Sequence, residues 1–543
     1  MRLRVTPAES SPGDYGSKPG LSITTVLMTL LSVATISVLI YHYWRAIPAF
    51  GPQPANLDLA LDEMQFRGQQ INGLSLNGSW TYSLPGYYAG PFYVWAMALG
   101  GALGSSVLGP EWYYYSGYVF TQLLVLCATL WSVRQAHRWL KREWAVGFCV
   151  AILFMVTDAS NRSGGGFVPA LFFPSWGPTV ATGMFVAALM SFVVYAMSRK
   201  GLGGLVLFSG LAVQTHGAVE VPVAIMLLFP LYDVVRDSWG RSVRESFRKL
   251  RWVIGAVVLG WGVIIIHVAL DGINILLPTS GVISKGGSAG EKLQAASAQI
   301  AFGGDWISVL IPCAVSLVAL GAGFRWRKFA RVSVVAVLMS VWAVFALVAF
   351  SFSDAGAHAS VWYSASAYLL VGAGFVLAVG ATLQRLLAPR AGGWGNVVGG
   401  ALALLITINP FGYSFTPLDP AQSSMRADNA ESMRSIVVNL PQGNLNFLIT
   451  RETREESEPV IAAAQAYGHR VCRIQIYSGA PGESAVDEFT CPYGELENGR
   501  WLLVQDANDG FRYKGRLIVE GRVSESVWQV LEVPKNTLEF DGG

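Results

Sequence analysis

The residues best suited to chemistry lie in one stretch, Asn56 to Trp95, shortly after the first long apolar run. Asp58 and Asp62 are four residues apart, so a helix would present both carboxylates on one face. Glu63 and Arg67 repeat this spacing and can form an ion pair across one helical turn. A carboxylate held in this way can accept the proton of an attacking hydroxyl group, as a general base does. The spacing alone fits a solvated amphipathic helix on a membrane surface equally well.

A second polar group separates two apolar runs. Gln214 and His216 stand between residues 202–213 and 217–232, and Glu220 follows His216 by four residues. This spacing predicts that His216 and Glu220 share one helical face. Ionisable groups at the edge of a membrane span are costly and usually face a cavity or a partner. We interpret the group either as a binding site for a hydroxylated or phosphorylated ligand, or as a polar pair that locks two helices together.

Weaker candidates lie in other polar segments. Tyr87 and Tyr88 are candidate substrate contacts, and Arg162, Lys285 and Lys292 are candidate phosphate ligands, with solvated loops as the alternative. The sequence has no Cys/His spacing typical of a metal site and no nucleotide-binding fingerprint in a suitable context. We therefore expect that no cofactor is required, and a divalent metal ion remains compatible with this expectation.

The composition indicates a membrane protein. Of 543 residues, 52% are hydrophobic and only 13% are charged, whereas soluble proteins carry about 25% charged residues. The mean hydropathy is +0.43, and the 18 Trp and 20 Tyr residues suit aromatic belts at two interfaces. A net charge of +3 argues against nucleic acid as a partner.

Basic loops fix the predicted topology. Residues 92–108 look like a weak span, but counting them would place the basic loop 134–142 on the same side as the acidic loop 44–90, against the positive-inside rule. We therefore predict an interfacial or re-entrant helix there. Residues 1–20 are predicted to be a disordered cytoplasmic tail, and residues 21–410 a domain of about eleven spans. These are 22–41, 115–133, 144–157, 178–197, 202–213, 217–232, 252–270, 304–323, 332–350, 359–383 and 395–409.

The C-terminal part is more polar. Residues 411–424 are predicted to be a linker and residues 425–543 a small α/β domain, extracytoplasmic by the count of spans. A helical run near 459–466 stands among β-rich runs. Cys472 and Cys491 are predicted to form a disulfide in an oxidising compartment. The β-rich runs are residues 435–440, 447–450, 471–476, 501–505, 516–519 and 527–533.

Taken together, a first span, a long outer loop with an early aspartate, interfacial helices and many further spans resemble the GT-C superfamily of integral-membrane glycosyltransferases. The segments DLALDEMQFRG (58–68) and GSWTYSLPGYYAGPFYVW (78–95) resemble bacterial, especially actinobacterial, members, and LAVQTH (211–216) resembles their Gln-x-His segment. Those members close the Tyr/Gly-rich stretch on His-Pro-Gly-Pro. Here the stretch ends in Ala89-Gly90-Pro91, without the histidine.

The resemblance implies an inverting transferase in a bacterial plasma membrane. Its donor would be a sugar on a polyprenyl phosphate, and its acceptor a cell-envelope glycan or glycolipid at the outer face. The role of general base falls on Asp58, with Asp62 as the second choice. The alternatives are a transporter or flippase of lipid-linked sugar, for which internal repeats would be expected and none is evident, and a non-catalytic envelope-assembly scaffold.

Overall fold

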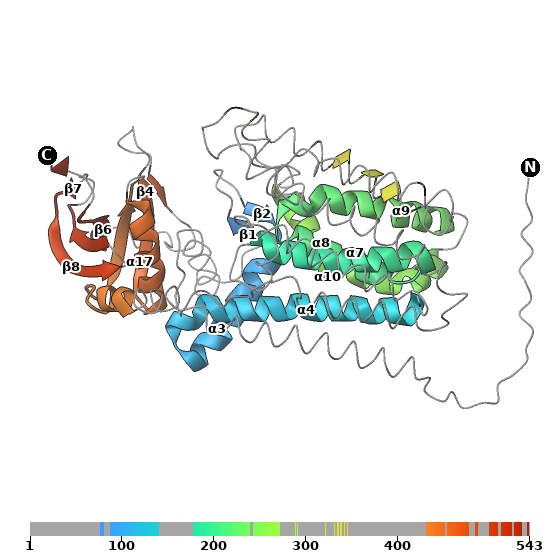
Figure 1. Ribbon diagram of the computed structural model, residues 1–543, viewed down its shortest axis with the longest axis horizontal. Coiled ribbons are helices and arrows are strands. Elements are labelled where there is room, and N and C mark those ends of the chain that lie inside the picture. The colour runs from blue at the N-terminus through green and yellow to red at the C-terminus, as the bar shows by residue number, and fades with distance from the viewer. Residues whose placement is uncertain are drawn as a thin grey trace, which may run out of the picture.

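The computed structural model describes two folded parts, a helical bundle and a C-terminal α/β part (Figure 1). The described residues are 77–80, 87–140, 177–238, 243–271, single positions between 288 and 345, 431–450, 453–476, 484–486, 499–508, 512–523, 526–534 and 540–541.

The bundle begins with an antiparallel hairpin of β1 (Asn77–Trp80) and β2 (Tyr87–Ala89), followed by apolar helices. The helices are α3 (Phe92–Leu108), α4 (Tyr113–Leu140), α7 (Gly177–Ser198), α8 (Leu202–Val213), α9 (Glu220–Ser238) and α10 (Val243–Asp271), with short 3-10 turns η2 (Pro110–Trp112) and η4 (Gly217–Val219).

Five predicted spans coincide with helices of the structure. The predicted span 202–213 is α8 itself, and 115–133, 178–197 and 252–270 lie within α4, α7 and α10. The predicted span 217–232 covers η4 and most of α9. The helices extend beyond the predicted spans, because α9 continues to Ser238 and α10 begins at Val243.

Among the described residues, one stretch is long and apolar enough to cross a membrane. It is Leu250–Leu270 of α10, with a mean hydropathy of 2.5 over its best window and only 22% of that window buried inside the protein. Large apolar side chains such as Val258, Leu259 and Leu270 are exposed along it. Exposed apolar surface of this extent suits a lipid environment.

The helices pack closely through glycine. A Cβ atom on Gly117 of α4 would collide with the carbonyl oxygen of Met97 in α3, and one on Gly210 of α8 with that of Gly260 in α10. Small residues let backbones approach in this way, and they are typical of helix contacts in membranes. Trp131 of α4 packs edge-on against Phe208 of α8, with ring centres 5.5 Å apart.

The two ends of the bundle differ in charge. At one end Lys200, after α7, lies over the ring of Trp139 near the end of α4, and Arg199 pairs with Asp233 of α9. At the other end lie the β1–β2 hairpin and the carboxyl end of α8 with Gln214 (Figure 1). We call the first the basic end. Its basic residues are Arg134, Arg138, Arg199, Lys200, Arg236 and Arg251.

The C-terminal part is a six-stranded mixed sheet in the order β5-β4-β3-β6-β9-β8, with the helix α17 packed on it. β3 is parallel to β4 and β6, and the outer pairs are antiparallel. The elements are β3 (Asn444–Ile449), α17 (Arg454–Ala466), β4 (Arg470–Ile476), β5 (Ser484–Val486), β6 (Arg500–Asp506), β8 (Arg516–Val523) and β9 (Ser526–Glu532), with a separate pair β7 (Arg512–Tyr513) and β10 (Phe540–Asp541).

One predicted β-rich run is wrong. Residues 435–438 belong to a helical stretch, 431–438, and not to a strand. Met433, Ile436, Val437 and Leu440 are all buried in the core beside the sheet. Their spacing of three and four residues is the period of a helix with one buried face, and it prevails over the β propensity of the two valines.

The C-terminal domain lies against the bundle at the end opposite the basic end. Its helix α17 contacts η2, the turn between α3 and α4 (Figure 1). Near the same turn, α3 packs closely on the start of α4: glycines 100, 101 and 104 of α3 lie against residues 113–120. The interfacial placement of α3 stays a prediction.

Gly210→Ala is expected to destabilise the bundle. Overpacking of a well-packed site costs about 1–3 kcal/mol, which exceeds the gain of up to about 1 kcal/mol in helix propensity. Gly262→Ala on α10 is the matched control, because nothing lies within 4 Å of a Cβ atom there. The test is the melting temperature of the full-length protein in detergent. Equal melting temperatures of the two variants would contradict the close approach of α8 to α10.

Glu458→Gln is expected to destabilise the C-terminal sheet. The Glu458 carboxylate accepts hydrogen bonds from Nε of Arg473 at 2.9 and 3.0 Å, and both side chains are almost fully buried. Removing one partner of a buried pair costs about 3–5 kcal/mol. Hydrogen exchange of β3 and β4 peptides in the full-length protein measures the effect.

The control is Glu532→Gln, which removes the partner of Arg516 in the same sheet. The Arg516 side chain is 69% exposed, so this loss is expected to cost at most about 1 kcal/mol. Similar exchange rates in the two variants would show that the buried pair stabilises the sheet no more than the exposed pair does.

Candidate functional site

The two motifs that the sequence singles out meet in the structure. Gly90, just after β2, is buried, and a Cβ atom on it would lie 2.5 Å from Cγ of Gln214 at the end of α8. The φ angle of Gly90 is +91°, a conformation that other residues rarely adopt. Glycine here lets the Tyr/Gly-rich stretch turn from β2 into α3 while touching Gln214.

Gln214 joins three elements. Its Nε2 donates a hydrogen bond of 2.7 Å to the carbonyl oxygen of Gly260 in α10, and its backbone N–H donates to Gly210 in α8. The side chain is 3% exposed. Because its amide is committed to the α10 backbone, Gln214 holds α8, α10 and the turn at Gly90 together.

His216 lies in the connection between α8 and α9. It is 7% exposed, and the preceding Thr215 donates its hydroxyl to Leu211 at 2.7 Å. Burial lowers the pKa of His216 well below its ordinary value, so the imidazole is neutral at pH 7. A neutral imidazole offers one N–H donor and one acceptor, which suits contact with a hydroxyl or phosphate group.

The predicted common face of His216 and Glu220 is wrong. The helix α8 ends at Val213, the 3-10 turn η4 spans Gly217–Val219, and α9 begins at Glu220. A spacing of four residues aligns two side chains only along one continuous α-helix. Glu220 instead occupies the first turn of α9.

The two tyrosines lie on the hairpin that leads to Gly90. Tyr87 pairs with Trp80 across the antiparallel hairpin, and Tyr88 follows in the same strand. The chain passes from them to Gly90 and the start of α3. Tyr87, Tyr88, Gln214 and His216 therefore come from two motifs at one end of the bundle.

The remaining predicted site residues lie outside the described residues, and their roles stay predictions. They are Asp58, Asp62, Glu63, Arg67, Arg162, Lys285 and Lys292. Cys472 on β4 is disulfide-bonded, and Cys491, its predicted partner, also lies outside the described part. Within that part no group of three or more His, Cys, Asp or Glu side chains could hold a metal ion.

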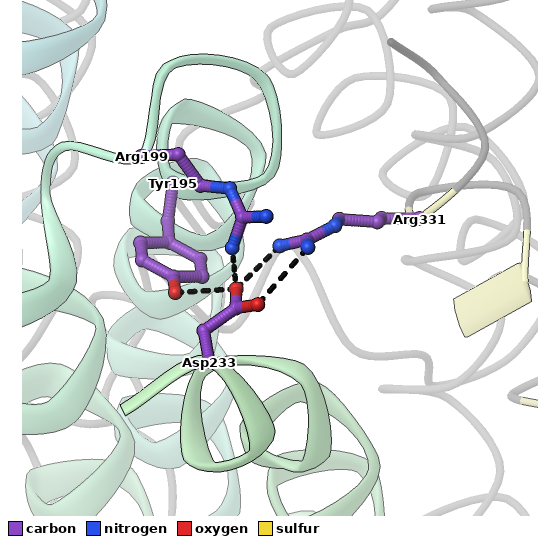
Figure 2. A network of polar contacts seen from close by, with 4 residues as sticks. All are labelled: Tyr195, Arg199, Asp233 and Arg331. Atoms are coloured by element: carbon purple, nitrogen blue, oxygen red, sulfur yellow. Dashed lines mark hydrogen bonds and ion pairs between the residues drawn. The ribbon is translucent and has the colours of Figure 1, made fainter. Parts of the chain in front are cut away.

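A polar network at the basic end was missed by the sequence analysis. Figure 2 shows the carboxylate of Asp233 in α9 between Tyr195 and Arg199 of the α7 end and Arg331. The Tyr195 hydroxyl donates to Oδ2 of Asp233 at 2.7 Å, and Arg331 donates to Oδ1 at 3.0 Å. Asp233 is 6% exposed. The position of Asp233 near the end of an apolar run could have indicated this network, since a buried acid there needs a partner.

Known proteins resemble this chain in fold and not in sequence. No protein-family model matches the sequence, and no curated protein matches it. The apo structure of ArnT from Cupriavidus metallidurans, a GT-C glycosyltransferase, superposes with a TM-score of 0.51 at 13% identity, over 93% of this chain and 99% of that one. This chain has the GT-C fold.

Two further solved structures are similar to this chain. ArnT from the same organism bound to undecaprenyl phosphate gives a TM-score of 0.48 at 14% identity, over 94% of this chain and 99% of that one. The oligosaccharyltransferase of Archaeoglobus fulgidus in its apo form gives a TM-score of 0.44 at 12% identity, over 89% of this chain and 69% of that one.

The GT-C structural neighbours are multi-pass membrane proteins, and the exposed apolar surface of α10 would suit a lipid environment in this chain as well. The apo ArnT match covers 93% of the chain, and it therefore extends beyond the helical bundle into the C-terminal domain. The predicted GT-C fold agrees with this likeness to apo ArnT. The likeness to actinobacterial members in particular stays a prediction.

Gln214→Ala is expected to loosen the turn at Gly90. The change removes a buried hydrogen bond to the Gly260 carbonyl, which costs about 0.5–1.5 kcal/mol. Hydrogen exchange of a peptide covering residues 87–95 should become faster. Gln135→Ala on α4, whose side chain accepts a bond from Trp139 far from this turn, serves as the control.

A double variant tests the contact itself. The single variant Gly90→Ala should destabilise the protein strongly, because the Cβ atom of the new alanine would collide with the Gln214 side chain. In the Gln214→Ala background the clash with Cγ is gone, so the added cost should be smaller, as for any two residues in contact. Strict additivity would show that the two motifs do not touch.

Proposed function

We propose that this protein is a glycosyltransferase that moves a sugar from a polyprenyl-phosphate donor to a cell-envelope glycan or glycolipid. The observation that carries the proposal is the GT-C fold, shared with apo ArnT over 93% of the chain at a TM-score of 0.51. The meeting of Gly90 with Gln214 supports it, because it joins the two segments that resemble GT-C motifs.

The reaction belongs at the extracytoplasmic face. Basic residues collect at one end of the bundle, and the positive-inside rule assigns that end to the cytoplasm. The hairpin β1–β2, His216 and Glu220 lie at the other end, where α17 of the C-terminal domain contacts η2. Donor, acceptor and C-terminal domain would then share the outer face of a plasma membrane.

The chemistry needs one base and one good leaving group. Asp58, or in second place Asp62, takes the proton of an acceptor hydroxyl. The hydroxyl oxygen bonds to the anomeric carbon while the bond from that carbon to the phosphate oxygen breaks. Polyprenyl phosphate leaves with the bonding electrons, and the configuration at the anomeric carbon inverts.

The neighbouring residues would bind and orient the donor. Neutral His216 can hydrogen-bond to a sugar hydroxyl or to a phosphate oxygen, and Glu220 to a hydroxyl. Gln214 acts by holding the turn at Gly90, since its amide is bonded to Gly260. Arg162, Lys285 and Lys292 are the candidate cations for the phosphate, so the scheme requires no metal ion. Glu63, Arg67, Tyr87 and Tyr88 are further candidate substrate contacts.

Asp58→Asn is expected to lower the rate of sugar transfer by about 10²–10⁴, the usual contribution of a general base. Donor binding should be retained, because the amide keeps the size of the carboxylate. The assay follows a radiolabelled polyprenyl-phosphate sugar and an envelope glycan acceptor with full-length protein in lipid nanodiscs. Asp62→Asn decides between the two acids.

Asp237→Asn at the basic end is the control and should transfer at the normal rate. If Asp58→Asn and Asp62→Asn both transfer normally, neither acid is the base. If the wild-type protein in vesicles moves intact lipid-linked sugar across the bilayer and transfers none, the proposal fails in favour of a flippase. Binding of the donor with neither activity would indicate a scaffold.

A further inference from the structure

We propose that Arg138, Trp139 and Lys200 form a binding site for the headgroup of an anionic phospholipid at the basic end of the bundle. We call it the Trp139 site. It lies at the opposite end from the proposed reaction and does not depend on the proposed function.

Two helices build the site. Cζ of Arg138 lies 4.9 Å from the ring centre of Trp139, and Nζ of Lys200 lies 5.4 Å from the same centre. Both cations and the indole are exposed. The indole N–H donates to Oε1 of Gln135 at 2.9 Å, which fixes the orientation of the ring on α4.

The turn after α7 brings Lys200 to this ring. Arg199 has a φ angle of +60° and Gly201 one of +85°, so the chain reverses within three residues between α7 and α8. Arg199 itself is tied to Asp233 (Figure 2). Lys200 is therefore held over Trp139 by the backbone of a short, anchored turn.

No acid among the described residues balances the charge of the site. Within the described part of the chain, neither Arg138 nor Lys200 pairs with a carboxylate, and Asp233 is occupied by Arg199 and Arg331. A cation over an exposed ring gains only about 0.5–1 kcal/mol, and two cations at one ring repel each other. An anion bound between them removes this repulsion.

The surrounding surface indicates a lipid as the source of that anion. Leu123, Cys127 and Trp131 follow one another at four-residue intervals on α4 and are all exposed, and the row continues through Gln135 to Trp139. An acyl chain can lie along this apolar row while its phosphate meets the two cations. Tryptophan is typical of the headgroup level, and basic sites near the cytoplasmic surface attract anionic lipids.

The test uses the full-length protein purified in detergent and titrated with phosphatidylglycerol. The lipid should raise the melting temperature of the wild-type protein, and phosphatidylcholine should raise it much less. In the double variant Arg138→Gln/Lys200→Gln the apparent affinity for phosphatidylglycerol should fall about tenfold or more, since each basic residue near a membrane contributes appreciably to attraction of anionic lipid. Lys200→Arg should retain binding.

The matched control is Arg236→Gln, which removes one exposed positive charge from the same end on α9. An equal loss of binding in this variant would overturn the proposal, because it would indicate a diffuse charge effect. Stabilisation by inorganic phosphate to the same extent would overturn the assignment to a lipid. Should the double variant not fold without lipid, Lys200→Gln alone gives the same comparison, and its unchanged affinity would refute the site.

Discussion

The close approach of α8 to α10 is the constraint on which the site depends. Gly210 and Gly260 face each other with no room for a Cβ atom, and Trp261 donates its indole N–H to the carbonyl of Val206 at 2.9 Å. Lipid tails are as apolar as leucine, so helices in a bilayer gain little from the hydrophobic effect and rely on close packing and hydrogen bonds. Only at this separation does the amide of Gln214 reach the backbone of Gly260.

The polar groups at the two ends of the bundle have different partners. At the site end, the Gln214 side chain donates a hydrogen bond to the backbone of α10, and burial keeps His216 neutral, so neither side chain carries a net charge. At the basic end, Asp233 meets two arginines and a tyrosine (Figure 2). This arrangement suits a helix end near charged lipid headgroups, where surplus cations find partners outside the protein.

The C-terminal part has a buried core of its own. Its central strands β3 and β6 are buried, as expected of parallel strands covered on both faces. The pair Arg473–Glu458 links β4 to α17 inside that core. Because α17 also contacts η2, the domain has a defined place beside the turn between α3 and α4.

The sequence by itself determined the apolar runs, the limits of α8 and the uneven distribution of basic residues, because these follow from local composition and periodicity. The general GT-C likeness came from the resemblance of short motifs to those of a known family. It singled out Gln214, His216 and the Tyr/Gly-rich stretch as unusual. Only the tertiary structure decided that Gly90 touches Gln214, that Glu220 opens a new helix instead of sharing a face with His216, and that Lys200 lies over Trp139. Such contacts join residues far apart in the chain or depend on the geometry of a short turn. Neither can be predicted from the residues that neighbour each position in the sequence.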